Sequence, residues 1–448
     1  MSSDYEVDVA IVGGGACGLM AALRAGRNSE LTVAVFEKST KAGCNSKLSS
    51  GSLAASGTSY QRAAGIDDTP ERQADEIIAA SGDESSRDII LALCSVSADF
   101  VEWLADDLDY PIELGTDMPR SGFSVPRLHT DRGRMGGQRL ISTMRDAVER
   151  LPSVSFVDNC PGTGLLYDGA SVTGVTIDES GITRRVSARE VVLATDGFGA
   201  NRSMLEAYCP DIVDSPYGGV STSTGEAIQW GQELGAATHQ MGAFLGSGLT
   251  VPGHGTRVNP ALPFLGALMV DESGRRFVDE TKHGYSPLGE VIATLPGQRA
   301  AIFWGDEAMR VVEETHLMRE SARSGAYQRY DTLEEAALAY GMPADDLAAS
   351  LAELAAERGH GPDQALNFPL YGAWITRGML TTQGGLVVDT LGRVLREDGT
   401  VIVGLSAGGG SAAGISGPSP KGYTSGNGLL AAMGFGWIIG NRLAAAGM

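Results

Sequence analysis

The chain has 448 residues, a formal net charge of −21 at pH 7, a hydrophobic fraction of 43% and a charged fraction of 20%. This length allows two or three domains with full cores, and the charge argues against nucleic acid and anionic membranes as partners. The five cysteines lack CxxC spacing, which predicts reduced thiols and no metal site. With neither a leader pattern nor an apolar run of transmembrane length, we expect a cytoplasmic protein without membrane insertion.

The first elements predict a β-α-β unit. Residues 9–12 are apolar and β-branched, as in a buried parallel strand. The turn "GGGACG" follows, with Gly13, Gly15 and Gly18 in GxGxxG spacing before a helix. Such a turn lets the backbone and the helix N-terminus approach a pyrophosphate. Glu37 ends the next strand, 19 residues after Gly18, where its carboxylate can accept hydrogen bonds from an adenosine ribose. The unit predicts binding of FAD or NAD.

Further along, the pattern changes several times. Residues 70–150 are mostly helical, and residues 154–195 are short strands of a small meander whose last strand rejoins the central sheet. Gly and Pro become frequent after residue 241, two helices follow near 331–357, and strands precede a final apolar helix near 428–446. We therefore predict a discontinuous nucleotide-binding domain with an inserted domain. The predicted limits are 1–240 and 377–448 for the first domain and 241–376 for the insertion.

Several motifs favour FAD and carry a family resemblance. The Ser- and Gly-rich loop after Glu37 offers N–H and hydroxyl donors along a flavin. It contains "GCNS" and "SGS", which resemble the "GGNSxxxxGG" segment of flavoproteins of the fumarate reductase and 3-ketosteroid dehydrogenase type. "VVLATDGFGAN", "GRRFVDE" and "TQGGLVVD" resemble that family's "VVLATGGFGxN", "GxRFxxE" and "TxGGLxxD". The matches extend from Asp8 to Gly440.

The resemblance implies an α/β fold: a Rossmann-like FAD-binding domain, with a parallel sheet and a β-meander, and an inserted α+β substrate-capping domain. It also implies noncovalent FAD, because no histidine follows the Ser-rich loop where respiratory members attach the flavin. Cys44 and Asp196 stand where family members have glycine, and Gly409 stands where many have an acid. The expected cofactor residues are Gly13, Gly15, Ala16, Cys17, Gly18, Glu37, Lys38, Ser39, Cys44, Asn45, Ser46, Ser50, Gly51, Ser52, Ala194, Thr195, Asp196, Gly408, Ser425, Asn427, Gly428 and Leu429.

The C-terminal segment "KGYTSGNGLL" favours one reaction within the family. Its "GYTSG" resembles the "GYxSG" of Δ4-type ketosteroid dehydrogenases, which implies catalytic roles for Tyr423 and Ser425, and for Tyr285 after the "GxRFxxE" element. The Tyr423 hydroxyl and the amide of Asn427 or Gly428 would polarise a ketone oxygen. Tyr285 would take the α-proton while the β-hydrogen leaves as hydride to flavin N5. A proton relay through Ser425 and Tyr423 would exchange the tyrosine roles.

The expected function is therefore a FAD-dependent dehydrogenase that introduces a C=C bond next to the ketone of a 3-ketosteroid or a smaller oxocyclohexane-type substrate, with an unknown electron acceptor. An enoate reductase like fumarate reductase is the first alternative. Three groups that this alternative needs are missing here. The segment "TKHGYSPLGE" has no donor arginine, and the Thr381–Thr382 stretch replaces the family's histidine. The second carboxylate-binding arginine, expected near Tyr423, is also absent. A non-catalytic flavin electron carrier is the second alternative, and the inserted domain argues against it.

Other charged residues have weaker expectations. Arg127 and Lys421 could bind a substrate carboxylate, although an exposed salt bridge is the commoner role for such side chains. His129 is expected to be structural or on the surface, and so is His283, which is also a reserve candidate for the base.

Overall fold

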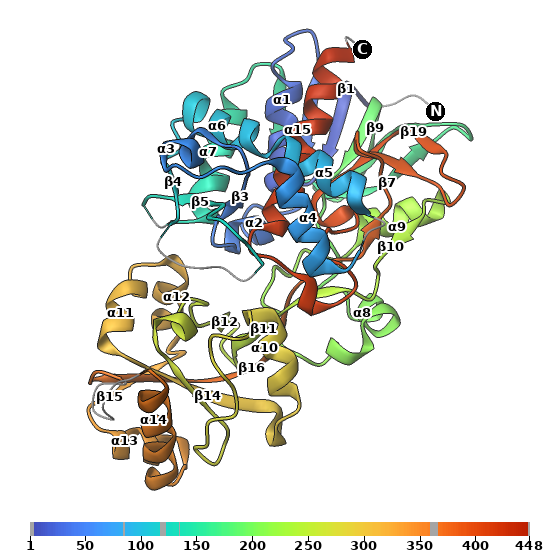
Figure 1. Cartoon of the computed structure of the whole chain (residues 1–448). Helices are drawn as coiled ribbons and strands as arrows, with labels where there is room; N and C mark the ends of the chain where they lie inside the picture. Colours follow the sequence, from blue (N-terminus) through green and yellow to red (C-terminus); the bar gives the residue numbers. More distant parts are fainter. Residues whose placement is uncertain (1–3, 84–85, 117–121, 134, 359–365, 447–448) are drawn as a thin grey trace. The chain divides into compact units, whose positions relative to one another are not determined.

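The computed structural model describes residues 4–83, 86–116, 122–133, 135–358 and 366–446, which form two compact units (Figure 1). Unit 1 comprises residues 1–213, 219–244 and 381–448, and unit 2 comprises residues 214–218 and 245–380. Each unit has its own β-sheet and its own apolar core.

The helices and strands have the following bounds. The helices are α1 (Ala16–Ala25), α2 (Asn45–Leu48), α3 (Ser59–Ala63), α4 (Pro70–Ser81), α5 (Arg87–Ser95), α6 (Ser97–Leu108), α7 (Gly137–Glu149), α8 (Arg202–Tyr208), α9 (Glu226–Glu233), α10 (Tyr285–Ala293), α11 (Asp306–Val312), α12 (His316–Ser324), α13 (Leu333–Tyr340), α14 (Ala344–Glu357) and α15 (Asn427–Ala446). The strands are β1 (Tyr5–Val12), β2 (Val33–Phe36), β3 (Leu53–Ala54), β4 (Ile112–Leu114), β5 (Leu128–Asp131), β6 (Val154–Val157), β7 (Gly162–Tyr167), β8 (Val172–Glu179), β9 (Ile182–Leu193), β10 (Thr238–His239), β11 (Phe244–Val251), β12 (Thr256–Arg257), β13 (Leu268–Val270), β14 (Arg299–Gly305), β15 (Gln328–Tyr330), β16 (Leu370–Thr382), β17 (Gly385–Leu386), β18 (Arg393–Leu395) and β19 (Val401–Ala407).

The central sheet of unit 1 has the order β18-β19-β9-β1-β2-β6. Strands β19, β9, β1, β2 and β6 are parallel, and the register pairs Val12 with both Phe36 and Leu193. Because parallel strands all end at the same edge, the turns after β1, β2 and β9 come together there. The last four residues of β1 and all of β2 are buried, as expected for strands covered on both faces.

The meander is built differently from the sequence prediction. Strands β7 and β8 form an antiparallel pair, and β8 pairs with the first half of β9. The strand predicted to rejoin the central sheet is not separate from the meander strand before it, because both belong to β9, which continues into the central sheet. Its first half is largely exposed or partly buried and carries Arg184 and Arg185, whereas its last four residues are all buried. That change of environment looks like a strand boundary in the sequence. Strand β6 belongs to the central sheet instead of the meander.

Helices α1 and α15 run side by side in the core of unit 1 (Figure 1). A Cβ on Gly436 would lie 2.5 Å from the carbonyl oxygen of Cys17, and a Cβ on Gly440 would lie 2.6 Å from that of Ala21. Glycine therefore permits the close approach of the two backbones. Contrary to the expectation from the sequence, α15 is long and apolar enough to cross a membrane by length and composition. However, 67% of its most apolar window is buried, as in a core helix.

Unit 2 contains an antiparallel sheet in the order β12-β11-β16-β14-β13, with β15 also paired to β16. Its core gathers Phe303 of β14 and Tyr340 of α13, whose rings meet edge to face with centroids 4.8 Å apart. Sequence patterns located α13 and α14 but missed helices α10, α11 and α12. These helices have only seven to nine residues, too few for a clear helical period.

Candidate functional site

The glycine turn after β1 forms a cradle with one open side. A Cβ on Gly13 (φ +107°) would lie 2.2 Å from the carbonyl oxygen of Ala194, and a Cβ on Gly18 would lie 1.9 Å from that of Gly13. Those two glycines are required for packing. At Gly15 the nearest neighbour of a Cβ would be the Cβ of Cys44, 3.8 Å away. The backbone at Gly15 is thus accessible at the N-terminus of α1, which fits a pyrophosphate.

A pocket with about 760 Å³ of empty space opens at this turn, at the carboxyl ends of the parallel strands. Twelve of the predicted cofactor residues line it: Gly13, Gly15, Ala16, Cys17, Glu37, Lys38, Cys44, Asn45, Ser46, Ala194, Thr195 and Asp196. It is also lined by residues that the sequence did not single out as pocket residues: Val12, Phe36, Gly43, Gly162, Val220, Thr222, Ser223, Glu226, Trp230, Gly409, Gly410 and Ala432.

Glu37 is held in place by the backbone at the adenosine end of the proposed cofactor site. One carboxylate oxygen accepts the Gly14 N–H at 2.7 Å, and the other accepts the Ser39 N–H at 2.8 Å. Each oxygen keeps a lone pair for a further donor, as ribose hydroxyls would supply. Ser39 therefore acts on the site through its backbone, and it does not line the pocket itself.

Lys38 is paired with an acid from α9. Its ammonium lies 2.5 Å from Glu226 Oε1 and 2.8 Å from Thr224 Oγ1. Trp230, one turn after Glu226, also lines the pocket. This wall comes from a helix nearly 190 residues after Lys38 in the chain, so a local motif search could not find it.

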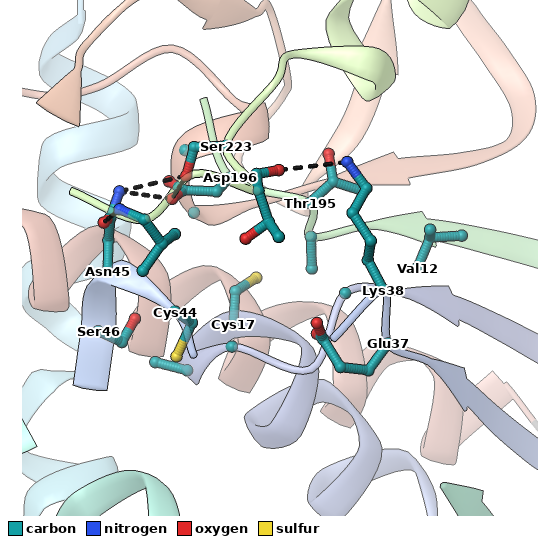
Figure 2. Close-up of a pocket in the computed structure, with 18 of the residues that line it drawn as sticks. Val12, Cys17, Glu37, Lys38, Cys44, Asn45, Ser46, Thr195, Asp196 and Ser223 are labelled. Carbon is teal, nitrogen blue, oxygen red and sulfur yellow. Dashed lines mark hydrogen bonds between the residues drawn. The ribbon is translucent and has the colours of Figure 1, made fainter. Parts of the chain in front are cut away.

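Asp196 is the centre of a second polar cluster, shown in Figure 2. Its Oδ2 accepts hydrogen bonds from Asn45 Nδ2 at 2.6 Å and from Ser223 Oγ at 2.5 Å. Asn45 Oδ1 in turn accepts the Val220 N–H at 2.9 Å. Burial raises the pKa of the Asp196 carboxyl, against the opposing effect of its hydrogen bonds from Ser223, Gly197 and Asn45. The cluster ties together three loops that line the pocket.

Burial disfavours the thiolate form of the two cysteines in the pocket. Burial raises the pKa of Cys17 to about 12, and it raises the pKa of Cys44 to the same value. A thiol with that pKa forms almost no thiolate at neutral pH. Cys44 therefore contributes a small, partly buried side chain to the cofactor pocket.

Some predicted cofactor residues lie outside this pocket. They are Gly18, Ser39, Ser50, Gly51, Ser52, Gly408, Ser425, Asn427, Gly428 and Leu429. A Cβ on Gly51 would lie 2.5 Å from the backbone of Gly136, so the Ser50–Ser52 loop packs against the start of α7. A Cβ on Gly408 would lie 2.6 Å from Cys17 Sγ, so this glycine serves packing while Gly409 and Gly410 face the pocket.

Tyr423 lies beside the N-terminus of α15. Its hydroxyl would be 4.0 Å from a Cβ on Gly428, which is exposed, while Tyr423 is half-buried. Asn427 is buried, and its side chain accepts the Thr424 hydroxyl at 2.6 Å and donates to Ser416 Oγ at 3.2 Å. The Asn427 N–H also donates to the Thr424 carbonyl at 3.3 Å. Of the two candidate amides, Gly428 is therefore the better placed to bind a substrate oxygen.

Ser425 and Tyr285 lie in different units. Ser425 is partly buried in the turn between Tyr423 and α15. Tyr285 is the first residue of α10 in unit 2, with the Arg257 guanidinium carbon 5.9 Å from its ring centroid. The nearby "GxRFxxE" element is structural, because Arg276 Nη2 donates to Glu280 Oε2 at 2.8 Å in a buried ion pair.

Arg127 and His129 are interior residues instead of ligand-binding ones. Arg127 is fully buried and donates through Nε and Nη2 to both oxygens of Asp68, at 2.7 and 2.8 Å. This arrangement excludes the exposed salt bridge that its residue type suggested. His129 is also fully buried, with Nδ1 2.9 Å from the Arg127 carbonyl and Nε2 2.9 Å from Thr58 Oγ1. Lys421 is exposed.

Comparisons with known proteins agree with the cofactor site. A family described as "FAD binding domain" matches residues 8–429. The probable fumarate reductase Ifc3 of Shewanella frigidimarina is 27% identical over 450 residues, which cover 97% of this chain and 74% of that protein.

Two solved structures extend the similarity to the fold. The open conformation of a flavocytochrome c3 fumarate reductase has a TM-score of 0.84 and 26% identity, covering 100% of this chain and 79% of that one. The 3-ketosteroid-delta4-(5alpha)-dehydrogenase of Rhodococcus jostii RHA1, in complex with 4-androstene-3,17-dione, has a TM-score of 0.74 and 25% identity. The match covers 99% of this chain and 98% of that one.

These similarities confirm the predicted fold class and FAD as the cofactor. The fumarate reductase superposes with the higher TM-score, so the comparisons do not support a place nearest the ketosteroid branch. The glycine cradle, the Glu37 carboxylate and the pocket around them fit that cofactor. The chain belongs to the FAD binding domain family and is a FAD-dependent oxidoreductase whose relatives include fumarate reductases.

Proposed function

We propose that the protein is a FAD-dependent dehydrogenase that introduces a C=C bond α,β to the ketone of a cyclic substrate. The observation that carries the proposal is the position of the Tyr423 hydroxyl beside Gly428 at the start of α15. A phenol and a helix-terminal amide are the two donors that a developing enolate oxygen requires. No acidic residue stands in the first turn of α15, so the helix itself does not neutralise the positive end of its dipole.

The first proposed role follows from this pair. The Tyr423 O–H and the Gly428 N–H bind the ketone oxygen, which makes the neighbouring C–H more acidic. The family resemblance, and not this pair, is the ground for proposing Tyr285 as the base that removes the α-proton. It is also the ground for the alternative assignment, in which Ser425 relays a proton through Tyr423. FAD, when bound, supplies the two-electron acceptor for the β-hydrogen.

We also propose that FAD is held without a covalent bond. Among the described residues that line the pocket there is no histidine to carry such a bond. The two cysteines there have thiols whose pKa is about 12. The substrate is proposed to be a 3-ketosteroid or a smaller oxocyclohexane-type ketone, and a cytoplasmic location remains a prediction.

Reduction of an enoate is the second candidate, and the similarity to fumarate reductases favours it. The segment before α15 favours the ketone reaction instead. The family resemblance implies an arginine for a substrate carboxylate near Tyr423, and the sequence has no arginine there. A neutral phenol binds a ketone oxygen well but gives a carboxylate much less stabilisation than a guanidinium.

Both reactions can be tested with one anaerobic experiment. The oxidised holoenzyme is mixed with 3-ketosteroids and monocyclic ketones, and loss of the visible flavin absorbance is followed. In the reverse arm, chemically reduced holoenzyme is mixed with fumarate and other enoates, and its reoxidation is followed. Bleaching by a ketone, with slow reoxidation by enoates, is expected. Rapid reoxidation by an enoate without bleaching by any ketone would replace the ketone proposal with the enoate one.

A further inference from the structure

Asp196 combines an unfavourable backbone with a central position in the FAD pocket. It follows β9 with φ +73°, in the left-handed region that side chains other than glycine rarely adopt. A Cβ on Gly410 would lie 2.4 Å from Asp196 Oδ1, so the Asp196 carboxyl packs directly against the Gly410 backbone. A glycine would adopt this backbone conformation at lower cost but could not make the hydrogen bonds of the Asp196 carboxyl.

The Asp196 carboxyl joins three loops of the pocket wall. It accepts from Asn45 at 2.6 Å, from Ser223 at 2.5 Å and from the Gly197 N–H. All of these partners are neutral, and no described residue forms an ion pair with Asp196. The Asp196 carboxyl thus accepts hydrogen bonds from several parts of the pocket wall, and none of these donors is a cation that would balance its charge.

The pocket that would receive the dianionic pyrophosphate of FAD has an excess of acidic side chains. The lining residues include three carboxylates, Glu37, Asp196 and Glu226, and one ammonium, Lys38, which is already paired with Glu226. Charge repulsion in a buried site is strong because water screens it poorly. Taking up one proton removes the unbalanced charge at Asp196, whereas Glu37 is needed as an acceptor.

We propose that Asp196 is a positioning residue that becomes protonated when FAD binds, so that FAD binding takes up a proton. The groups facing Asp196 from its neighbours are Asn45, Ser223, the backbone of Gly197 and Gly410, and the Cys44 thiol. The Cys44 thiol, with a pKa of about 12, stays protonated throughout the neutral range. Binding of an anion raises the proton affinity of a nearby carboxyl further, so FAD affinity falls as pH rises.

The test is calorimetric titration of FAD into the full-length apoprotein, in buffers of different ionisation enthalpy, from about pH 5 to about pH 9. The proposal predicts uptake of up to about one proton and an affinity that falls by up to about tenfold per pH unit where uptake is greatest. Asp196→Asn is expected to abolish the uptake and flatten the profile. Asp158→Asn, which replaces an acid outside the pocket, is expected to leave the uptake unchanged.

A second variant keeps the test decisive if Asp196→Asn does not hold FAD. Ser223→Ala removes one donor to the Asp196 carboxylate. Because that hydrogen bond favours the charged form, proton uptake and the fall in FAD affinity should both shift to higher pH in this variant. Wild-type protein that binds FAD without taking up a proton would overturn the proposal. So would an Asp196→Asn variant that takes up as many protons as the wild type. These readouts depend on FAD binding and are independent of the proposed ketone reaction.

Discussion

The side-chain amide of Asn45 donates a hydrogen bond of 2.6 Å to Asp196, which lies 151 positions later in the chain. Asn45 follows the loop after β2, and Asp196 follows β9. Since β1 separates these two parallel strands in the sheet, the contact exists only because the strand ends share one edge. The same amide side chain accepts the Val220 N–H, so one residue holds two other loops of the FAD pocket.

Replacement of Asn45 should therefore loosen the cofactor. Asn45→Ala removes the hydrogen bonds of this side chain to Asp196, Ser223 and Val220 and is expected to weaken FAD binding by about 1–3 kcal/mol, or roughly fivefold to 150-fold. Quenching of flavin fluorescence during titration of the apoprotein measures this change. Asn28→Ala is the matched control, since Asn28 also bonds within unit 1, to the Ala444 carbonyl, but is not a pocket residue. Equal losses in both variants would mean that Asn45 acts only on overall stability.

The buried ion pair of Arg127 should be important for folding. Arg127→Met leaves the Asp68 carboxylate buried without its partner, and such losses cost about 3–5 kcal/mol. Urea denaturation should show a lower midpoint for this variant. The double variant Arg127→Met with Asp68→Asn should recover part of the loss, because no buried charge remains at position 68. A single variant as stable as the wild type would refute this account of the pair.

His129 should make the stability of unit 1 depend on pH. Burial lowers the pKa of His129 to about 4, whereas a histidine in the unfolded chain titrates near 6.5. The unfolded state therefore binds the proton first, so the stability is fully present above about pH 6.5 and falls as the pH drops toward about 4. The loss is up to about 3 kcal/mol. Denaturation of His129→Gln should lack this part of the pH dependence, while a variant of the exposed His254 should retain it.

The contact between α1 and α15 should not tolerate even one methyl group. In Gly436→Ala the new Cβ would lie 2.5 Å from the Cys17 carbonyl oxygen and 2.7 Å from the Met20 Cβ. We expect a loss of about 1–3 kcal/mol in the free energy of unfolding. Gly428→Ala on the same helix is the control, because the nearest atom to its Cβ is Tyr423 Oη at 4.0 Å. Similar thermal midpoints for the two variants would contradict the close packing described for Gly436.

Local signals explain how much of the molecule could be predicted from the sequence. The β1-turn-α1-β2 unit depends on residues close in the chain, so the cradle and Glu37 could be identified directly. Ser223, Glu226 and Trp230 reach the pocket only through the strand order and the position of α9. No spacing rule connects them to the glycine turn. The one signal in the sequence that could have pointed to Glu226 was the need of Lys38 for an acidic partner, and several other acids in the chain could have met that need.

The second part of the proposed site shows the same limit. The sequence offered the amide of Asn427 or Gly428, and the buried bonds of Asn427 to Thr424 and Ser416 distinguish between them. Arg127 looked like a surface cation because arginine is seldom buried, and its contacts with the carboxylates of Asp68 and Glu76 make burial favourable. Both outcomes depend on partners that local patterns did not identify.

The most direct test of the proposed reaction compares wild-type enzyme with Tyr423→Phe in a single anaerobic turnover with a cyclic ketone. Tyr423→Phe keeps the ring and removes only the hydroxyl beside Gly428, so FAD content and visible spectrum should be unchanged. The account predicts rapid flavin bleaching in the wild type and bleaching at least about a hundredfold slower in the variant. Bleaching at the same rate in both proteins, or no bleaching of the wild type by any ketone, would contradict it.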